Sequence, residues 1–213
     1  LAIMIKRLAD YYYNTGLTYA RKNEISAAIE KLLQSLALSR ENINALNLLG
    51  LCFYRMGEYE KANKFWRESL LIEGTDNPAS YYLAELEKER AVLKDLINYI
   101  QPLIAGKKYK KALRIIKKVG NISLSSISIN CISDGRISFS RISAGSIINW
   151  LKKKSIKNNT SNFNTNNVKF LNYVGVLYRL SGKRKHAEEF WKKSLAIDRT
   201  NKQALDYITI RGL

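Results

Sequence analysis

The sequence has few of the residues on which catalysis and metal binding usually depend. Its 213 residues include one histidine, His186, and two cysteines, Cys52 and Cys131. Two cysteines without a motif spacing provide neither a disulfide framework nor a zinc site. A single histidine with no nucleophile or carboxylate at motif spacing gives no catalytic constellation. We therefore expect a protein that is not an enzyme and that uses no cofactor and no metal.

Long apolar runs are missing as well. No stretch approaches the roughly 18 apolar residues of a membrane-spanning helix. Residues 1–10 also lack the apolar region of a signal peptide. We therefore expect a cytoplasmic protein without a membrane span. Because the sequence begins with Leu1 and not with methionine, it is compatible with a piece of a longer protein.

Acidic residues are scarce in the second part of the chain. Residues 1–90 contain 12 lysines and arginines against 12 acidic residues, whereas residues 91–213 contain 24 against 6. The whole net charge of +18 therefore comes from the second part. The basic residues cluster at 107–118, 152–157 and 183–193. A field of this sign attracts acidic protein segments, nucleic acid or anionic membrane surfaces.

What the sequence does have is a spacing pattern that occurs three times. Gly16, Gly50 and Gly175 are each followed by an alanine 12 positions later and by a Ser-Leu pair 19 positions later. The first two of these glycines are 34 positions apart. Seven positions after each glycine stands a residue suited to the left-handed turn that ends a helix, namely Asn23, Gly57 and Gly182.

Apolar and aromatic residues recur at helical spacing around these positions. Each segment therefore predicts two amphipathic helices joined by a tight turn, with the glycine of the first helix facing the alanine of the second. One such pair cannot bury its own apolar face, so it must stack on a neighbouring pair. The sequence thus predicts an all-α fold, an α-solenoid of antiparallel helix pairs.

The pattern resembles the tetratricopeptide repeat, in which a bulky residue, a Leu-Gly pair, an aromatic residue, an alanine and a second bulky residue recur. In the second segment these residues are Leu46, Leu49, Gly50, Phe53, Ala62 and Trp66. The resemblance covers residues 9–76, as two regular repeats, and residues 168–201, and it implies a right-handed superhelix. Thr15 departs from the leucine of the pattern. Where the family has a closing proline, this sequence has Arg40, Thr75 and Arg199.

Residues 77–118 are predicted to form a divergent third helix pair. Asn77 and Pro78 are typical of a helix start, and apolar residues at helical spacing follow them. Pro102 is expected to end or kink this helix. A second, strongly basic helix is expected over residues 109–118.

Residues 119–167 do not follow the repeat. They contain 11 serines and 9 asparagines, and Asp134-Gly135 between two Ile/Ser alternations is a signal for a β-hairpin. The same stretch is faintly similar to one blade of a WD-repeat propeller, which could not close alone. The alternative is a degenerate repeat with a helix over residues 146–156. Beyond the regular repeat at 168–201, residues 202–213 predict a capping helix.

The resemblance implies a binding site and not an active site. In the family, the first helices of successive pairs line a concave groove that holds an extended peptide or a partner helix. The positions that match this lining are Tyr13, Asn14, Leu17, Asn44, Asn47, Leu51, Tyr54, Lys169, Asn172 and Arg179. Asn47 and Asn172 share one repeat position, and an asparagine amide can pair with the backbone of any extended peptide.

Two functions of different classes are compatible with these features. The first is a non-enzymatic scaffold that binds an extended or acidic segment of a partner protein in the groove. The second is electrostatic binding of nucleic acid or of an anionic membrane by the basic second part. The sequence contains no nucleic-acid-binding motif, and few aromatic residues lie among the lysines, which favours the scaffold.

Overall fold

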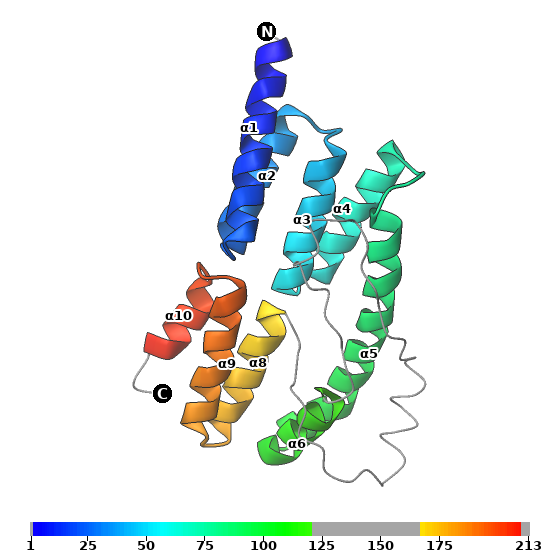
Figure 1. Ribbon diagram of the computed structural model, residues 1–213. Helices are drawn as coiled ribbons and strands as arrows, with labels where there is room; N and C mark the ends of the chain where they lie inside the picture. Colours follow the sequence, from blue (N-terminus) through cyan, green and yellow to red (C-terminus); the bar gives the residue numbers. More distant parts are fainter. Residues whose placement is uncertain (1, 121–166, 210–213) are drawn as a thin grey trace.

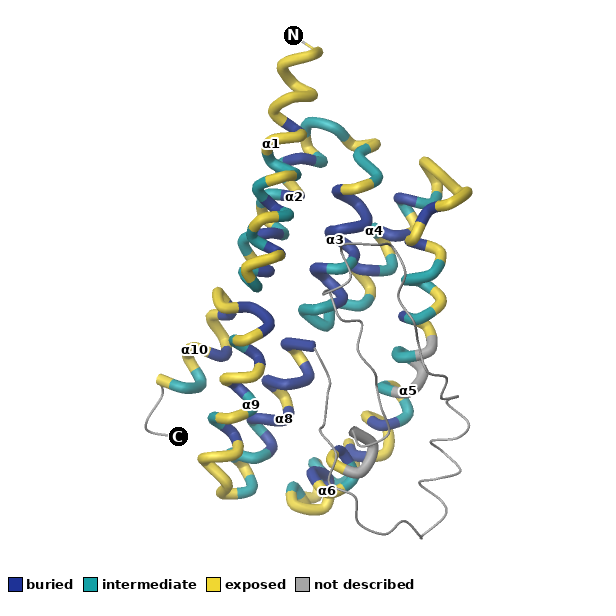
Figure 2. The backbone as a smooth tube through the Cα atoms, in the orientation of Figure 1, coloured by how far each residue is buried: buried dark blue, intermediate teal, exposed yellow. Residues whose placement is uncertain are grey.

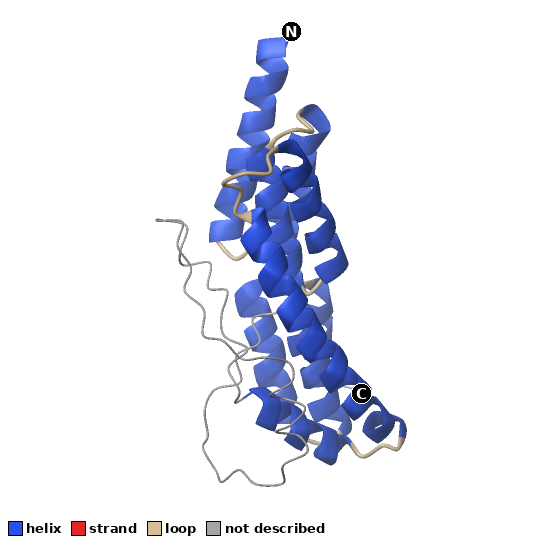
Figure 3. Ribbon diagram, turned by 90° about the vertical axis from the view of Figure 1, so that its right-hand side faces the viewer, coloured by secondary structure: helices blue, strands red, loops and turns tan. Residues whose placement is uncertain are grey.

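The computed structural model describes residues 2–120 and 167–209, and every regular element in these ranges is an α-helix (Figures 1 and 3). In chain order the helices are α1 (Ala2–Arg21), α2 (Ile25–Leu38), α3 (Ile43–Met56), α4 (Tyr59–Ile72), α5 (Ala79–Ala105), α6 (Tyr109–Gly120), α8 (Val168–Leu180), α9 (Arg184–Ile197) and α10 (Lys202–Thr209). The predicted all-α solenoid of helix pairs is confirmed for these ranges. The handedness of the superhelix and the division into repeats stay predictions. The predicted hairpin and the alternative helix over 146–156 lie outside the described residues.

The two helices of each pair are joined by the same kind of turn. The residue that makes the turn has a positive φ in all four cases, at Asn23 (60°), Gly57 (81°), Lys107 (54°) and Gly182 (81°). The backbone N–H of the next residue donates to a carbonyl five positions earlier, as from Glu58 to Phe53 at 2.9 Å. This is the Schellman geometry, in which a left-handed residue ends a helix. Three of the four turn residues are those that the sequence predicts.

Close packing within a pair depends on the glycine of its first helix. A Cβ atom on Gly50 would lie 2.1 Å from Nε1 of Trp66, and one on Gly175 would lie 2.2 Å from Nε1 of Trp191. In the first pair the smaller Leu32 takes the place of the tryptophan. The three repeat alanines are fully buried, and in the first pair the carbonyl of Ala28 would lie 3.3 Å from a Cβ atom on Gly16. The closest atoms beside each glycine belong to the residue 16 positions after it.

Two main clusters of buried side chains hold the helices together, and α5 contributes to both. Figure 2 shows buried residues along α3, α5 and α8. The first cluster runs from α1 to α5 and includes Trp66 and Leu86, both fully buried. The second joins α5, α6 and α8 and includes Leu96, Ile116 and Leu177. Over the described ranges no helix, not even the 27-residue α5, is long and apolar enough to cross a membrane.

The start of α5 agrees with the prediction, and the helix continues beyond Pro102. Oδ1 of Asn77 accepts the backbone N–H two positions later at 3.0 Å, and Pro78 has a helical φ of −62°. Pro102 does not end the helix, which continues to Ala105. A proline lacks its own N–H, but its carbonyl can still accept a hydrogen bond. The carbonyl of Pro102 accepts the N–H of Gly106 at 3.1 Å, so one further turn forms.

The last helix covers one side of α9. Ala204 is fully buried in a cluster with Trp191, whose ring centroid lies 5.2 Å from that of Tyr207. The backbone N–H of Ala204 donates to Oδ1 of Asn201 at 2.8 Å, which caps the start of α10. A short closing helix of this kind is what a stack of helix pairs needs at its end.

The C-terminal pair α8–α9 lies against the turns of the first two pairs (Figure 1). A small apolar cluster at this junction contains Val168, Leu171 and Ile197, with Met56 packed against it. The backbone N–H of Arg199 donates to the carbonyl of Asn23 at 2.8 Å. The stack therefore returns to its beginning, which the order of repeats in the sequence does not predict.

Candidate functional site

Asn47 and Asn172 occupy equivalent places in their helix pairs, as their shared repeat position predicts. The indole N–H of Trp66 donates to the backbone carbonyl of Asn47 at 3.2 Å. In the same way Trp191 donates to the carbonyl of Asn172 at 3.4 Å. Because a buried indole N–H needs an acceptor, these bonds explain why the tryptophans lie over the glycines.

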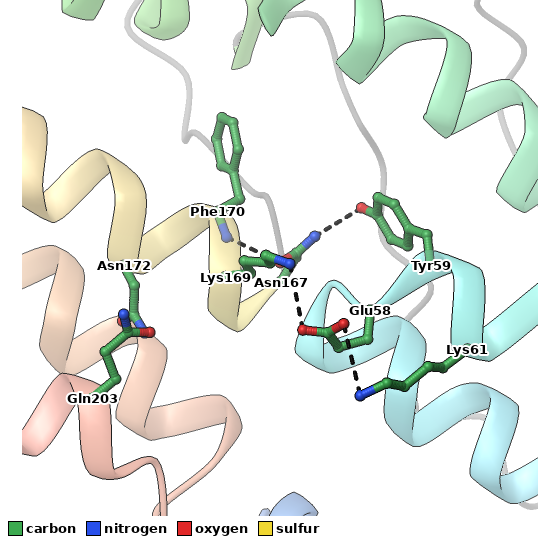
Figure 4. Close-up of polar contacts among 8 residues, drawn as sticks. All are labelled: Glu58, Tyr59, Lys61, Asn167, Lys169, Phe170, Asn172 and Gln203. Atoms are coloured by element: carbon green, nitrogen blue, oxygen red, sulfur yellow. Dashed lines mark hydrogen bonds and ion pairs between the residues drawn. The ribbon is translucent and has the colours of Figure 1, made fainter.

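The side-chain amides of the two asparagines contact the segment that follows their own pair. Nδ2 of Asn47 donates to Oδ1 of Asn77 at 3.0 Å. Nδ2 of Asn172 donates to Oε1 of Gln203 at 3.3 Å, and Figure 4 shows this second pair. Both asparagines are buried, and the Oδ1 atom of each is covered and has no hydrogen-bond partner. These amides therefore join successive pairs. Direct contact of Oδ1 with a bound peptide would require a neighbouring side chain to move.

Tyr54, the third buried member of the predicted groove, connects α3 to α5. Its hydroxyl donates to the carboxylate of Glu89. Burial, followed by the nearby charge of Glu89, raises the pKa of Tyr54 far above its usual range. Burial also raises the pKa of Glu89, although the hydrogen bond from Tyr54 opposes that shift. Tyr54 therefore keeps its proton and remains a donor to α5.

The other seven predicted groove residues keep contact with solvent. Three are exposed, namely Asn14, Asn44 and Lys169, and four are half-buried, namely Tyr13, Leu17, Leu51 and Arg179. Three of the half-buried residues, Tyr13, Leu17 and Leu51, pack against the first core cluster. Lys169 and Arg179 lie apart from them, near the two ends of α8.

Lys169 takes part in the junction between α8 and the α3–α4 turn (Figure 4). Its Nζ lies 3.4 Å from Oε1 of Glu58, and Nδ2 of Asn167 donates to the hydroxyl of Tyr59 at 2.8 Å. Oδ1 of Asn167 accepts the N–H of Phe170 at 3.0 Å and so caps α8. Asn167 is not among the predicted site residues and falls in the segment at 119–167 that is predicted to be irregular. An asparagine directly before a periodic apolar run is the signal that identifies such a cap.

A buried carboxylate completes the same junction. Asp198 is 0% exposed and accepts hydrogen bonds from the hydroxyls of Ser26 at 2.6 Å and Thr200 at 2.7 Å. A buried charge requires such partners. Nearby, Arg55 donates to Oδ1 of Asn23 at 3.0 Å. Burial lowers the pKa of Arg55, and the negative charge of Asp198 opposes that shift.

A second feature lies where α8 ends, away from this junction. The α5–α6 turn and the end of α8 line an open surface pocket of about 510 Å³, hereafter the lysine cavity. It is lined by Lys107, Lys108, Tyr109, Lys110, Lys111, Leu180 and Ser181. The sequence locates the basic cluster but not its contact with α8, because the two segments are distant along the chain.

The described ranges contain no constellation for catalysis or metal binding. Within them no group of three His, Cys, Asp or Glu side chains could hold a metal ion. The ring of His186 stacks on Tyr178, with centroids 5.4 Å apart. Cys52 is a free thiol, 2% exposed, and burial raises its pKa to about 12. A thiol with this pKa is not a nucleophile near neutral pH.

Comparison with known families agrees with the helix pairs. The family model described as "TPR repeat" matches residues 16–57, from the glycine of α1 to the turn after α3. This match covers about a fifth of the chain, and it agrees with the repeated turns and the glycine packing of the same segment. Among curated proteins no significant match to the sequence is found.

Two solved structures are among those to which the chain is similar. One is the TPR domain of P58(IPK), at 13% identity and a TM-score of 0.41, with 94% of this chain and 54% of that chain covered. The other is pilF of Pseudomonas aeruginosa, at 15% identity and a TM-score of 0.34, with 96% and 69% covered. The chain thus spans about half the length of the first structure. Similarity at this level has no bearing on function.

Proposed function

We propose that the chain is a non-enzymatic scaffold that binds an extended segment of a partner protein along its first helices. Tetratricopeptide repeats generally mediate protein–protein interaction, and the matched residues include the end of α1 and the whole of α2 and α3. The observation that carries the proposal is a set of half-buried apolar side chains on α1 and α3, Tyr13, Leu17 and Leu51, accompanied by exposed Asn14 and Asn44. Accessible apolar surface with polar groups beside it is what peptide recognition requires.

The predicted groove residues have two different roles in this proposal. The exposed and half-buried ones contact the partner directly. Asn47, Tyr54 and Asn172 act indirectly, because their hydrogen bonds to neighbouring segments hold the first helices at a fixed spacing. Lys169 and Arg179 add positive charge at the two ends of α8, which favours an acidic segment.

The acidic character of the partner is supported by the charge distribution. Residues 91–213 contain 24 basic and 6 acidic residues. The resulting positive field speeds the association of an acidic segment and repels a basic one. The scaffold needs no cofactor in this proposal. We propose the cytoplasm as its location, since Cys52 is a free buried thiol and no disulfide framework stabilises the fold.

Photocrosslinking in the native cell tests the proposal. A photoreactive phenylalanine analogue replaces Leu17 or Asn44 on the first helices, or Leu71 on α4 as a control that is 86% exposed. We expect one polypeptide to be crosslinked at Leu17 and Asn44 and not at Leu71. Equal crosslinking at all three positions, or none at the first two, would contradict groove binding.

Binding of nucleic acid or of an anionic membrane is the alternative. It is favoured by α6, which with the turn before it holds the basic cluster at 107–118. A protein that contacts six or more phosphates loses roughly a thousandfold in affinity between about 50 and about 200 mM salt. A groove that binds mainly through apolar and backbone contacts loses much less. The salt dependence of oligonucleotide and vesicle binding therefore separates the two functions.

A further inference from the structure

The four turns within the helix pairs have opposite charges in the two parts of the structure. In the α1–α2 and α3–α4 turns the left-handed residue is followed by Glu24 and Glu58. In the α5–α6 and α8–α9 turns the same position holds Lys108 and Lys183. Since the backbone N–H of all four residues makes the same hydrogen bond, the positions are equivalent. The charge reversal is therefore a property of one defined place in the fold.

The two basic turns contain further cations. The first has Lys107, Lys108, Lys110 and Lys111, and the second has Lys183, Arg184 and Lys185. α6 and α8 share a core cluster, and both reach the lower end of Figure 1. The lysine cavity lies at this contact, because the four lysines of the first turn line it together with Leu180 and Ser181 at the end of α8.

Over residues 2–120 and 167–209, no ion pair compensates these lysines. The sequence has no aspartate or glutamate from residue 96 to residue 133. Among the described residues, none of the four lysines of the lysine cavity has an ion-pair partner, whereas Lys61 and Lys64 on α4 each pair with a glutamate. Like charges gathered without partners repel one another and lower stability. Their concentration around one hollow therefore points to a role outside folding.

The backbone conformation of Lys107 and the position of its neighbours at a helix start lower the stability further. Lys107 adopts a φ of 54°, a conformation that the equivalent positions give to glycine or asparagine. Lys108 and Lys110 lie at the start of α6, where positive charge opposes the helix dipole. Most residues of a fold follow the local preferences for backbone conformation and charge. Residues that depart from these preferences are typical of functional positions.

We propose that the lysine cavity binds a cluster of carboxylates on an acidic segment of the partner protein. This inference rests on the proposed scaffold function and adds the place where the charged part of the partner docks. The cavity volume of about 510 Å³ lies within the range of ligand sites, roughly 300–1,000 Å³. Lysine ammonium groups on long stems can each turn toward a different carboxylate oxygen.

The lining of the cavity favours carboxylates over nucleic acid. Tyr109 is its one aromatic side chain, which offers little stacking surface to bases. No arginine lines the cavity, although bidentate guanidinium pairs are a frequent means of phosphate recognition. A compact hollow also suits a short run of acidic side chains better than a long nucleic-acid backbone.

Fluorescence anisotropy of the full chain with a fluorescein-labelled octaglutamate peptide tests this proposal. The test variant is K107Q/K108Q/K110Q/K111Q, in which all four replaced side chains are exposed. We expect this variant to bind the peptide roughly tenfold more weakly or worse, because four charge pairs are lost together. Circular dichroism checks that the variant keeps its helices.

A matched control is K6Q/K22Q/K192Q/K202Q, which removes the same charge from exposed lysines elsewhere. We expect a loss of roughly twofold or less in this control, since only long-range attraction changes. Equal losses in the two variants would overturn the proposal. The proposal would also be overturned if the unmodified chain bound an oligothymidylate of eight nucleotides more tightly than octaglutamate.

The outcome is independent of the test of the scaffold function. If octaglutamate binding depends on the four lysines while Leu17 and Asn44 yield no crosslink, the lysine cavity stands and the groove is wrong. If the crosslinks form and the octaglutamate affinity is unchanged in the variant, the groove stands and the lysine cavity is wrong.

Discussion

Ser26 donates its hydroxyl to the carboxylate of Asp198 over 2.6 Å, although 172 positions separate the two residues in sequence. The bond joins the first turn of α2 to the residue that follows α9. In an open solenoid each repeat contacts only its neighbours. Here the fourth helix pair also contacts the first, so the stability of the two ends of the chain is coupled.

Removal of the Asp198 carboxylate is expected to weaken this junction. The variant Asp198→Ala leaves the hydroxyls of Ser26 and Thr200 without their acceptor in a buried place. Hydrogen bonds to a charged group contribute about 1.5 to 3 kcal/mol, and we expect the free energy of unfolding to fall by that amount. Urea denaturation measures the change. Asp206→Ala on exposed α10 is the control, and an equal loss in the two variants would contradict the role of Asp198.

A methyl group at Gly50 is expected to destabilise the second helix pair. The new Cβ atom would lie 2.1 Å from Nε1 of Trp66, so the indole or the helix must shift. Overpacking of this kind costs about 1 to 3 kcal/mol, and thermal or urea unfolding of Gly50→Ala measures it. Gly74→Ala is the control, because there the nearest atom lies at 3.7 Å. A change at Gly50 as small as that at Gly74 would show that the contact is not tight.

The helix pairs could be predicted because their determinants are close together in sequence. Gly50 and Trp66 are 16 positions apart, and the turn at Gly57 lies between them, so one short segment defines the whole unit. In the first pair the carbonyl of Ala28 would lie 3.3 Å from a Cβ atom on Gly16, as the spacing predicts. The spacing does not show that the side chain 16 positions after each glycine packs closest to it.

Other features could not be predicted because they depend on distant contacts. Helical periodicity places Asn47 on the inner side of α3, but only the position of Asn77 shows that its amide is covered. The closure at Ser26 and Asp198 has no signal in the repeat pattern. The lysine cavity likewise requires α6 and α8 to meet, which residue spacing does not reveal.

The stability of the protein is expected to depend on the protonation of Glu89. Burial raises the pKa of Glu89 above 4.5 in the folded state, so the folded protein holds this proton more tightly than the unfolded chain. The resulting stabilisation is present at low pH and is lost as the pH rises from about 4.5 through the folded pKa. Glu89→Gln removes this dependence.

Urea unfolding between about pH 4.5 and about pH 7 checks this expectation. The slope of the free energy of unfolding against pH gives the difference in bound protons between the unfolded and the folded state. The free energy of unfolding should fall with rising pH more steeply in the unmodified protein than in Glu89→Gln. The exposed Glu41→Gln variant should follow the unmodified protein. Parallel pH profiles for Glu89→Gln and the unmodified protein would show that Glu89 is not perturbed.

The thiol of Cys52 is expected to be unreactive in the folded protein. It is 2% exposed, and burial raises its pKa to about 12, so little thiolate forms near neutral pH. In a Cys131→Ser background, a chromogenic disulfide reagent should label Cys52 only as fast as the fold opens. Labelling in buffer at the rate found in concentrated urea would mean that α3 is not packed as described.

Because α5 is one continuous helix, its length determines how the two core clusters are oriented. Leu86 belongs to the first cluster and Leu96 to the second. Each residue of an α-helix adds a rotation of about 100° and an advance of about 1.5 Å. Insertion of one alanine between these leucines would therefore turn α6, α8 and α9 by about 100° around the axis of α5. Ser26 would then no longer face Asp198, even though every helix pair kept its own packing.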